Sequence, residues 1–120
     1  MDDKAEILAL HHSYAEKFDA RDADAFADLF TDDGVMVPPG IREIAGRERL
    51  AKAVRNMPAG GTHLPLEATI EIDGDRANAI CQFRATTADG SQHRGTYKDQ
   101  YIRTIKGWRI VRREVVLDTK

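Results

Sequence analysis

The stretch YAEKFDARDADAFADLFTDDG, residues 14–34, decides the fold of this 120-residue chain. Tyr14 and Phe18 are four residues apart, so they lie on one side of a helix, and Asp19 follows where that helix is expected to end. Asp22 is a residue type that caps helices, which predicts a tight corner and a second short helix. A carboxylate at this corner can face the interior of the protein.

Two packed helices are predicted on either side of the corner. Residues 3–19 carry an apolar stripe of helical period, which is typical of an amphipathic helix. The stripe consists of Ile7, Leu10, His11, Tyr14 and Phe18. After the corner, Phe26, Leu29 and Phe30 have the spacing i, i+3, i+4, so we expect the second helix to include all three and to pack over the first.

The middle of the chain predicts a turn, a short strand and a third helix. Residues 31–34 have the composition of a turn, and the apolar residues 35–37 are followed by two prolines and a glycine. Because proline cannot donate to a sheet ladder, residues 35–37 are expected to form a brief edge strand. Gly46 precedes a helical pattern that ends before Pro58, which predicts the third helix.

The second half of the chain changes from a helical period to a period of two. Four stretches alternate apolar with polar residues, and turns that contain glycine separate them. These stretches are residues 64–72, 76–87, 93–105 and 108–116. Helices followed by strands predict an α+β fold, a single domain over residues 1–120, in which three helices pack on the concave face of a curved, mainly antiparallel sheet.

Composition argues against several classes of partner. The net charge of -2, from 18 basic and 20 acidic residues, provides no broad basic field for nucleic acid. No apolar run approaches the roughly 18 residues of a membrane span, and the start of the chain has no apolar leader. The single Cys81 cannot form an internal disulfide. We therefore expect a cytoplasmic protein without a nucleic-acid or membrane partner.

No pattern for a metal or an organic cofactor is present in the sequence. His11 and His12 are adjacent, so they point about 100° apart on a helix and cannot bind one metal ion together. His11 shares the stripe of Tyr14, which favours a place on the pocket wall. Cys81 has no acid–base group nearby and is expected in the core. We expect a site that works with no cofactor and no metal.

Four segments resemble the nuclear transport factor 2-like superfamily, in particular its SnoaL-like and scytalone dehydratase-like branches. The segments are FDARDADAFADLFTDDGV (18–35), IAGRERL (44–50), THLPLEATIEIDGDRANA (62–79) and GTYKDQYIRTIKGWRIVRREV (95–115). They cover nearly the whole chain in the order of the family. The resemblance implies a conical α+β barrel, open at one end, with a pocket between the helices and the concave sheet. It also implies a homodimer through the outer face of the sheet.

The resemblance further implies a catalytic site. Scytalone dehydratase, bile-acid 7α-dehydratase and hexachlorocyclohexane dehydrochlorinase pair an Asp near the end of the first helix with a His at the start of the first long strand. Asp19 and His63 match those places, and Tyr14 matches a tyrosine of the bile-acid enzyme. His63 would be the base, Asp19 would orient it, and Tyr14 would donate to developing negative charge.

The reaction implied is elimination by a cofactor-independent lyase, most simply dehydration of a small hydrophobic cyclic or polyketide-like compound. The expected pocket residues are Phe18, Met36, Phe83, Tyr97, Asp99 and Arg112. Arg112 is chosen over Arg113 because it has the strand parity of Trp108 and Ile110. Asp99 shares a strand face with Tyr97 and Arg103, so an Asp99–Arg103 ion pair is an equal alternative.

Other interpretations stay open on the residues alone. Asp19 can simply cap the corner, and His63 can be a satisfied polar residue at a strand start. The parity of His63 is opposite to that of Leu64, so His63 precedes the strand, a bulge near Pro65 re-aims it, or the apolar residues face a convex interface. The domain can also be a non-catalytic module that binds small molecules or dimerises, or an isomerase or cyclase. An Asp that ketosteroid isomerase would need is absent from residues 35–39.

Overall fold

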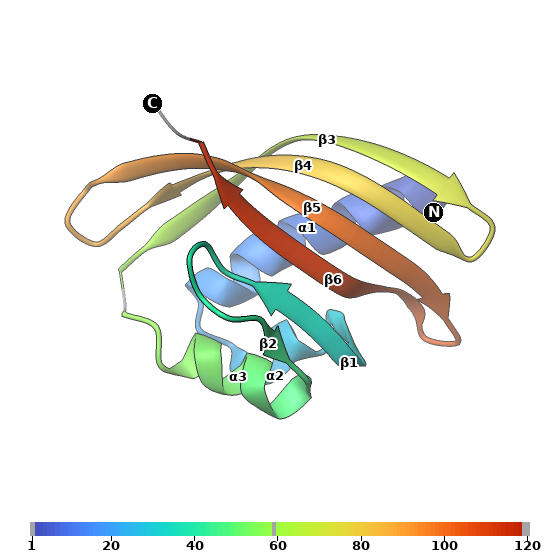
Figure 1. Ribbon diagram of the computed structural model, residues 1–120, viewed down its shortest axis with the longest axis horizontal. Coiled ribbons are helices and arrows are strands. Elements are labelled where there is room, and N and C mark those ends of the chain that lie inside the picture. The colour runs from blue at the N-terminus through green and yellow to red at the C-terminus, as the bar shows by residue number, and fades with distance from the viewer. Residues whose placement is uncertain (1, 59, 119–120) are drawn as a thin grey trace.

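Helices cover the concave face of a curved sheet in the computed structural model, which describes residues 2–58 and 60–118 (Figure 1). The elements in chain order are α1 (Asp3–Asp19), α2 (Ala23–Ala27), β1 (Phe30–Val37), β2 (Ile44–Ala45), α3 (Arg47–Arg55), β3 (Thr62–Asp73), β4 (Arg76–Thr86), β5 (Gln92–Thr104) and β6 (Gly107–Leu117). The predicted α+β architecture is confirmed, with a six-stranded sheet that curves without closing.

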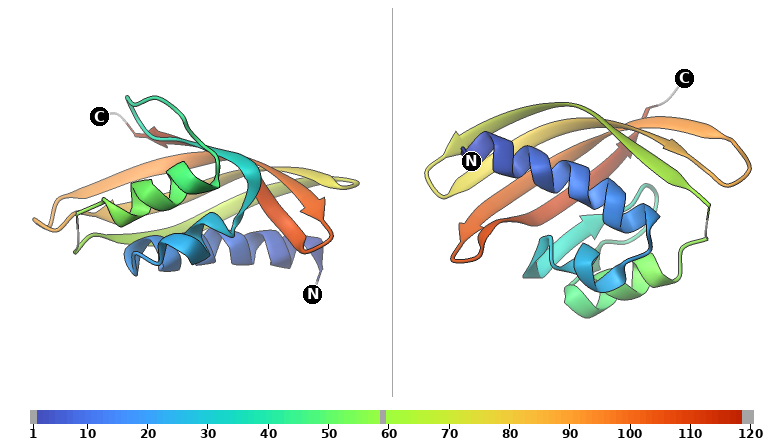
Figure 2. Two further views of the ribbon diagram at one scale, coloured as in Figure 1. Left: turned by 90° about the horizontal axis from the view of Figure 1, so that it is seen from below. Right: turned by 180° about the vertical axis from the view of Figure 1, so that it is seen from behind.

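The three described helices form one layer under the sheet. α1 lies against β3 and β6, whereas α2 packs on α3 and α3 packs on β1 (Figure 2). Asp2 caps α1 by accepting a 2.7 Å hydrogen bond from the backbone N–H of Ala5. Ile7, Leu10, His11 and Tyr14 of the predicted stripe are buried against the sheet. Among the described residues, no helix has the length and apolar character needed to cross a membrane.

The strand order is β2-β1-β6-β5-β4-β3, so β2 and β3 are the edges of the sheet. β3 to β6 form the predicted antiparallel meander, while β1 pairs with β6 in parallel. The prediction of a brief edge strand over residues 35–37 is wrong, because β1 has eight residues and lies inside the sheet. Its exposed Asp32 and Asp33 resemble a turn in the sequence, yet they are strand residues. Phe30 begins β1 rather than extending α2.

A bulge in β3 solves the parity problem of His63. The pairing of β3 with β4 shifts register between Pro65 and Ala68. Before the bulge, His63 faces the helices and Leu64 is 50% exposed on the outer side. After the bulge, Ala68 and Ile70 are the residues that pack on the core. The bulge near Pro65 is one of the alternatives that the sequence left open, and it places His63 on the concave face.

A second bulge re-aims the side chains of β6. Gln100 of β5 pairs with Arg112, whereas the next residue, Tyr101, pairs with Ile110, so Val111 is the extra residue. Because one extra residue inverts strand parity, Ile110 and Arg113 both point inward. The bulge therefore decides which of the two adjacent arginines enters the interior.

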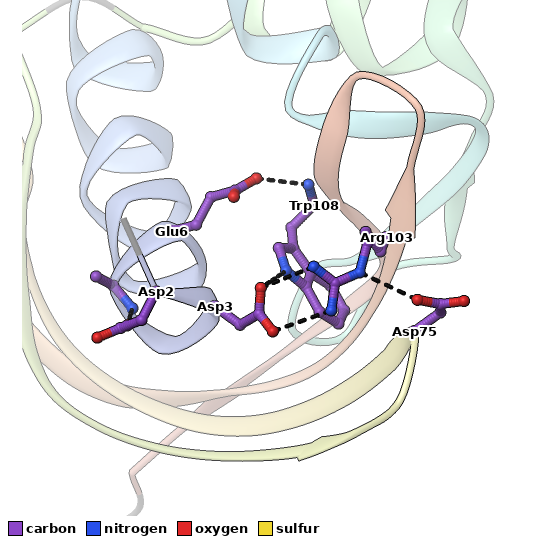
Figure 3. Close-up of polar contacts among 7 residues, drawn as sticks. Asp2, Asp3, Glu6, Asp75, Arg103 and Trp108 are labelled. Atoms are coloured by element: carbon purple, nitrogen blue, oxygen red, sulfur yellow. Dashed lines mark hydrogen bonds and ion pairs between the residues drawn. The ribbon is translucent and has the colours of Figure 1, made fainter.

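A polar network holds the start of α1 to the end of the sheet at which β5 turns into β6 (Figure 3). Arg103 of β5 donates to both carboxylate oxygens of Asp3 at 2.8 and 2.9 Å, and to Asp75 at 3.0 Å. Asp3 also accepts from the Trp108 indole at 3.1 Å, and Glu6 accepts from the Trp108 backbone N–H at 2.7 Å. These bonds fix the N-terminal end of α1 against β5 and β6. The C-terminal end of α1 lies at the start of β3, where Asp19 contacts His63.

Candidate active site

Asp19 and His63 meet where α1 ends and β3 begins. His63 Nδ1 lies 2.6 Å from Asp19 Oδ1, and the backbone N–H of His63 donates to Asp19 Oδ2 at 2.7 Å. The two bonds use both carboxylate oxygens. Because a carboxylate accepts, the neutral imidazole carries its proton on Nδ1 and leaves a lone pair on Nε2. Among the described residues, none bonds to Nε2.

The imidazole is positioned by packing but remains accessible. The ring of Phe18 lies 4.6 Å from the ring of His63, measured between centroids. The side chains of His63 and Asp19 are 19% and 23% exposed, respectively. A small molecule can therefore reach the pair, which a fully buried ion pair would not allow.

His63 lines a cavity of about 360 Å³ between the helices and the concave sheet. Four predicted pocket residues, Phe18, Met36, Phe83 and Tyr97, also line it. Other walls come from Pro38, Pro39, Ile44, Val54 and Val115. The lining is apolar except for two imidazoles and two phenols, so the cavity suits a hydrophobic ligand with few polar groups.

A smaller hollow of about 210 Å³ adjoins this cavity on the other side of His63. Asp19 and Arg21 line only the smaller hollow, whereas Phe18 and His63 line both. Asp19 therefore borders only the smaller, more polar hollow, whereas His63 lies between the two hollows and borders both.

Tyr14 lies on the wall of the main cavity and is only 2% exposed. Its hydroxyl donates to Met36 Sδ at 3.2 Å. Burial raises the pKa of Tyr14 well above its ordinary value, so the phenol stays protonated. The hydrogen bond that the sequence analysis assigned to a substrate oxygen is therefore made within the protein, to a weak thioether acceptor.

Asp99 is not on the cavity wall, which corrects its place among the expected pocket residues. Arg113 donates to its two carboxylate oxygens at 2.8 and 2.6 Å, and the Tyr101 hydroxyl donates to Asp99 at 2.6 Å. The side chains of Asp99 and Arg113 are both fully buried. The alternative Asp99–Arg103 pair is also wrong, because Arg103 binds Asp3 and Asp75.

Arg112 is a second correction. Its side chain is 39% exposed and lies 3.4 Å from Glu43, so it does not enter the cavity. The bulge at Val111 makes Arg113 the inward arginine, and the parity argument from Ile110 therefore selected the wrong neighbour. Arg113 lies beneath the cavity, with its guanidinium carbon 4.3 Å from the ring centroid of Tyr14.

His11 does not line the cavity either, which corrects the expectation drawn from its helix face. It is 1% exposed, and its Nδ1 lies 3.4 Å from Arg113 Nη2. Burial, followed by the positive charge of Arg113, lowers the pKa of His11 to about 4. His11 is therefore a neutral member of the buried cluster around Arg113.

The sequence analysis missed His93, which lines the cavity from β5. Ala85 of β4 pairs with His63 on one side and with His93 on the other, so the three residues form a row across the sheet. His93 has the parity of Gly95 and Tyr97, a signal that was available in the sequence. Within residues 2–58 and 60–118, no group of three His, Cys, Asp or Glu side chains is arranged to hold a metal ion.

The helix-covered curved sheet, with a cavity on its concave side, defines a protein of the nuclear transport factor 2-like class. The model of the SnoaL-like domain family matches residues 1–114. The chain therefore belongs to the SnoaL-like domain family, which confirms the resemblance seen in the sequence.

Similar proteins agree with this assignment. The chain is 29% identical over 123 residues to the uncharacterized protein Rv2910c of Mycobacterium tuberculosis (strain ATCC 25618 / H37Rv), covering 92% of this chain and 82% of that protein. An NTF2-like protein with a cystatin-like fold from Novosphingobium aromaticivorans has a TM-score of 0.88 and 29% identity, over 96% of this chain and 81% of the other. A scytalone dehydratase-like protein from the same organism shares the fold at a TM-score of 0.83 and 19% identity, over 97% and 84%.

Proposed function

We propose that the cavity is the active site of a cofactor-independent lyase, a dehydratase that acts on a small hydrophobic cyclic or polyketide-like compound. The observation that carries the proposal is the 2.6 Å contact between His63 Nδ1 and Asp19 Oδ1 at the wall of an apolar cavity. This contact leaves Nε2 free to act as a base toward a bound molecule.

In a dehydration that a base begins, a proton leaves carbon before, or as, a hydroxyl group leaves the neighbouring carbon. In our proposal, His63 Nε2 removes the proton, and the C–H electron pair forms the new double bond as the carbon–oxygen bond breaks. The departing hydroxide takes the proton from the imidazolium and leaves as water. Asp19 stays ionised and stabilises the transient imidazolium, as a carboxylate does for the histidine of a catalytic triad.

The cavity supports a hydrophobic substrate with few polar groups. Phe18, Met36 and Phe83 present apolar surface around His63. The volume of about 360 Å³ lies at the lower end of the roughly 300–1,000 Å³ typical of small-molecule sites.

The proposal is tested with a panel of small cyclic β-hydroxy ketones, whose dehydration produces a conjugated enone with near-ultraviolet absorbance. We expect the wild-type protein to accelerate at least one of these reactions, and His63→Ala to lower the rate constant by about 10²–10⁴-fold. The melting temperature should be nearly unchanged, because His63 is partly exposed. The matched control is His12→Ala, an exposed histidine of α1 outside the cavity, which should retain full activity.

Full activity in His63→Ala would refute the assigned role of His63. If the panel compounds bind in the cavity and none is turned over, the protein is a small-molecule binding module rather than a lyase.

We also infer that the protein forms a homodimer through the outer face of its sheet. Leu64 and Ile80 point outward from β3 and β4, and their side chains are 50% and 49% exposed. Large apolar side chains on one sheet face are favourable to bury against a second copy. Sedimentation should give about twice the 13.4 kDa chain mass. Ile80→Lys should shift the protein toward monomer, and a monomeric wild type would rule the dimer out.

A further inference from the structure

We propose that Tyr97 is a catalytic residue whose hydroxyl donates a hydrogen bond to a carbonyl oxygen of the substrate, while His63 attacks the adjacent C–H group. The proposal narrows the substrate class to compounds with a carbonyl next to the carbon that loses its proton. It rests on the proposed function for the reaction, but the hydrogen bond itself can be measured without turnover.

The Tyr97 hydroxyl differs from the other phenols in having no acceptor within the described residues. The Tyr14 hydroxyl donates to Met36 Sδ at 3.2 Å, and the Tyr101 hydroxyl donates to Asp99 Oδ2 at 2.6 Å. Tyr97 is only 3% exposed and lines the main cavity. In the described residues, the buried side-chain polar atoms without a partner are His11 Nε2 and Arg113 Nη1 and do not include the Tyr97 hydroxyl, so its oxygen is not fully enclosed by the protein. An oxygen atom of a bound molecule would supply that acceptor.

The ring of Tyr97 is held on both of its faces. Phe83 stacks on it with ring centroids 4.2 Å apart and an interplanar angle of 7°. The guanidinium carbon of Arg113 lies 3.9 Å from the ring centroid, and it must occupy the other face because Phe83 fills the first. Gly95 makes this stack possible, since a Cβ there would lie 2.6 Å from Phe83 Cζ. A ring fixed in this way presents its hydroxyl at a constant position, as preorganised catalysis requires.

Both phenols on the cavity wall stay protonated. Burial raises the pKa of Tyr97 well above its ordinary value, and burial also raises the pKa of Tyr14. The charge of Arg113 opposes the shift in both, and the charge of Asp99 adds to it. Tyr97 therefore keeps its proton, as a hydrogen-bond donor must.

The step can be written with atoms and electrons balanced. His63 Nε2 takes the proton from the carbon next to the carbonyl, and the C–H electron pair forms an enolate whose oxygen accepts the Tyr97 hydrogen bond. The enolate then re-forms the carbonyl as the bond to the β-hydroxyl group breaks. That hydroxide takes the proton from the His63 imidazolium and leaves as water. Tyr97 keeps its proton throughout and lowers the energy of the enolate.

The test uses 2-naphthol, an aromatic alcohol whose oxygen resembles the enolate oxygen, and naphthalene, which lacks that oxygen. Binding of each is measured by fluorescence titration to the wild type, Tyr97→Phe and Tyr14→Phe. We expect Tyr97→Phe to weaken 2-naphthol binding about tenfold, the loss expected for one hydrogen bond. Naphthalene binding should change less than about twofold, and Tyr14→Phe should bind 2-naphthol like the wild type.

Each other outcome overturns the proposal. Tyr97→Phe that binds 2-naphthol with wild-type affinity, or equal losses for both ligands, would show that the hydroxyl makes no bond to the ligand. The same holds if Tyr14→Phe carries the loss, or if wild-type protein fails to bind 2-naphthol. Thermal melting of Tyr97→Phe checks that the fold is intact. If Tyr97→Phe weakens 2-naphthol selectively but His63→Ala retains full lyase activity, the donor role stands and the proposed role of His63 fails.

Discussion

Two carboxylates of this protein meet a basic side chain at the same distance but in opposite surroundings. Asp19 Oδ1 lies 2.6 Å from His63 Nδ1, and Asp99 Oδ2 lies 2.6 Å from Arg113 Nη2. The first pair is about one-fifth exposed and borders a cavity, whereas the second is fully buried. Distance alone therefore does not distinguish the two pairs. What differs is that His63 lines the cavity and has a ring nitrogen without a partner among the described residues, whereas Asp99 is saturated by Arg113 and Tyr101.

The buried Asp99–Arg113 pair should contribute more to the free energy of unfolding than the Asp19–His63 pair does. Arg113→Met removes the cation and leaves the Asp99 carboxylate buried without its charge partner, so the free energy of unfolding should fall by about 3–5 kcal/mol. Urea denaturation of the variant and the wild type measures the difference. The double variant Asp99→Asn/Arg113→Met serves as the control and should recover part of the loss, because no uncompensated charge remains. A loss below about 1 kcal/mol in Arg113→Met would place the pair among weakly contributing ion pairs.

Two histidines sharpen the same contrast, because His11 belongs to the buried cluster and His63 to the cavity. The pKa of His11 is lowered from 6.5 to about 4, first by burial and then by Arg113. As the pH falls, His11 takes up a proton near pH 6.5 in the unfolded chain but only near pH 4 in the folded protein. The contribution of neutral His11 to the free energy of unfolding is therefore fully present above pH 6.5. It is lost as the pH falls toward 4, by up to about 3 kcal/mol.

Urea denaturation at several pH values between 4 and 7 measures this dependence on the intact protein and on His11→Gln. The variant should show a flatter dependence, because residue 11 no longer titrates. His12→Gln, on the exposed side of α1, is the matched control and should retain the wild-type slope. Equal slopes for His11→Gln and the wild type would mean that His11 takes up its proton at the same pH in the folded and unfolded protein, and would contradict the lowered pKa.

The cavity pair should affect activity far more than stability. Asp19→Asn keeps the shape of the side chain but removes the charge that stabilises the His63 imidazolium, so the rate constant on an identified substrate should fall about 10²-fold. The free energy of unfolding should change by less than about 1.5 kcal/mol, since only hydrogen bonds of a partly exposed group are altered. Asp22→Asn, which preserves the cap of α2, is the control. Full activity of Asp19→Asn would remove Asp19 from the mechanism.

The sequence predicted the elements whose periodicity is a consequence of burial. α1 and the strands β3 to β6 each bury one face, so their apolar residues recur at the helical or strand period and indicate these elements directly. β1 was underestimated because Asp32 and Asp33 are exposed, and its parallel partner β6 is more than 70 residues away. No local pattern reports such a pairing.

The site was predicted where it depends on residue type and missed where it depends on register. The contact between Asp19 and His63 followed from a family resemblance, and the wall residues Phe18 and Phe83 followed from strand and helix faces. Arg112 and Asp99 were assigned wrongly because the bulge at Val111 has no composition that marks it, and because a buried partner such as Arg113 is defined only by the folded sheet. His93 was visible in the parity of β5 and was overlooked.

The attachment of α1 at both ends has a mechanical consequence. Its 17 residues span about 25 Å between the network at Asp3 and the contact of Asp19 with His63. Attachment at two points restricts sliding and rotation of the helix, so Asp19 contacts His63 in the absence of a ligand. The entropy cost of ordering this pair is therefore incurred when the protein folds and not each time a small molecule binds.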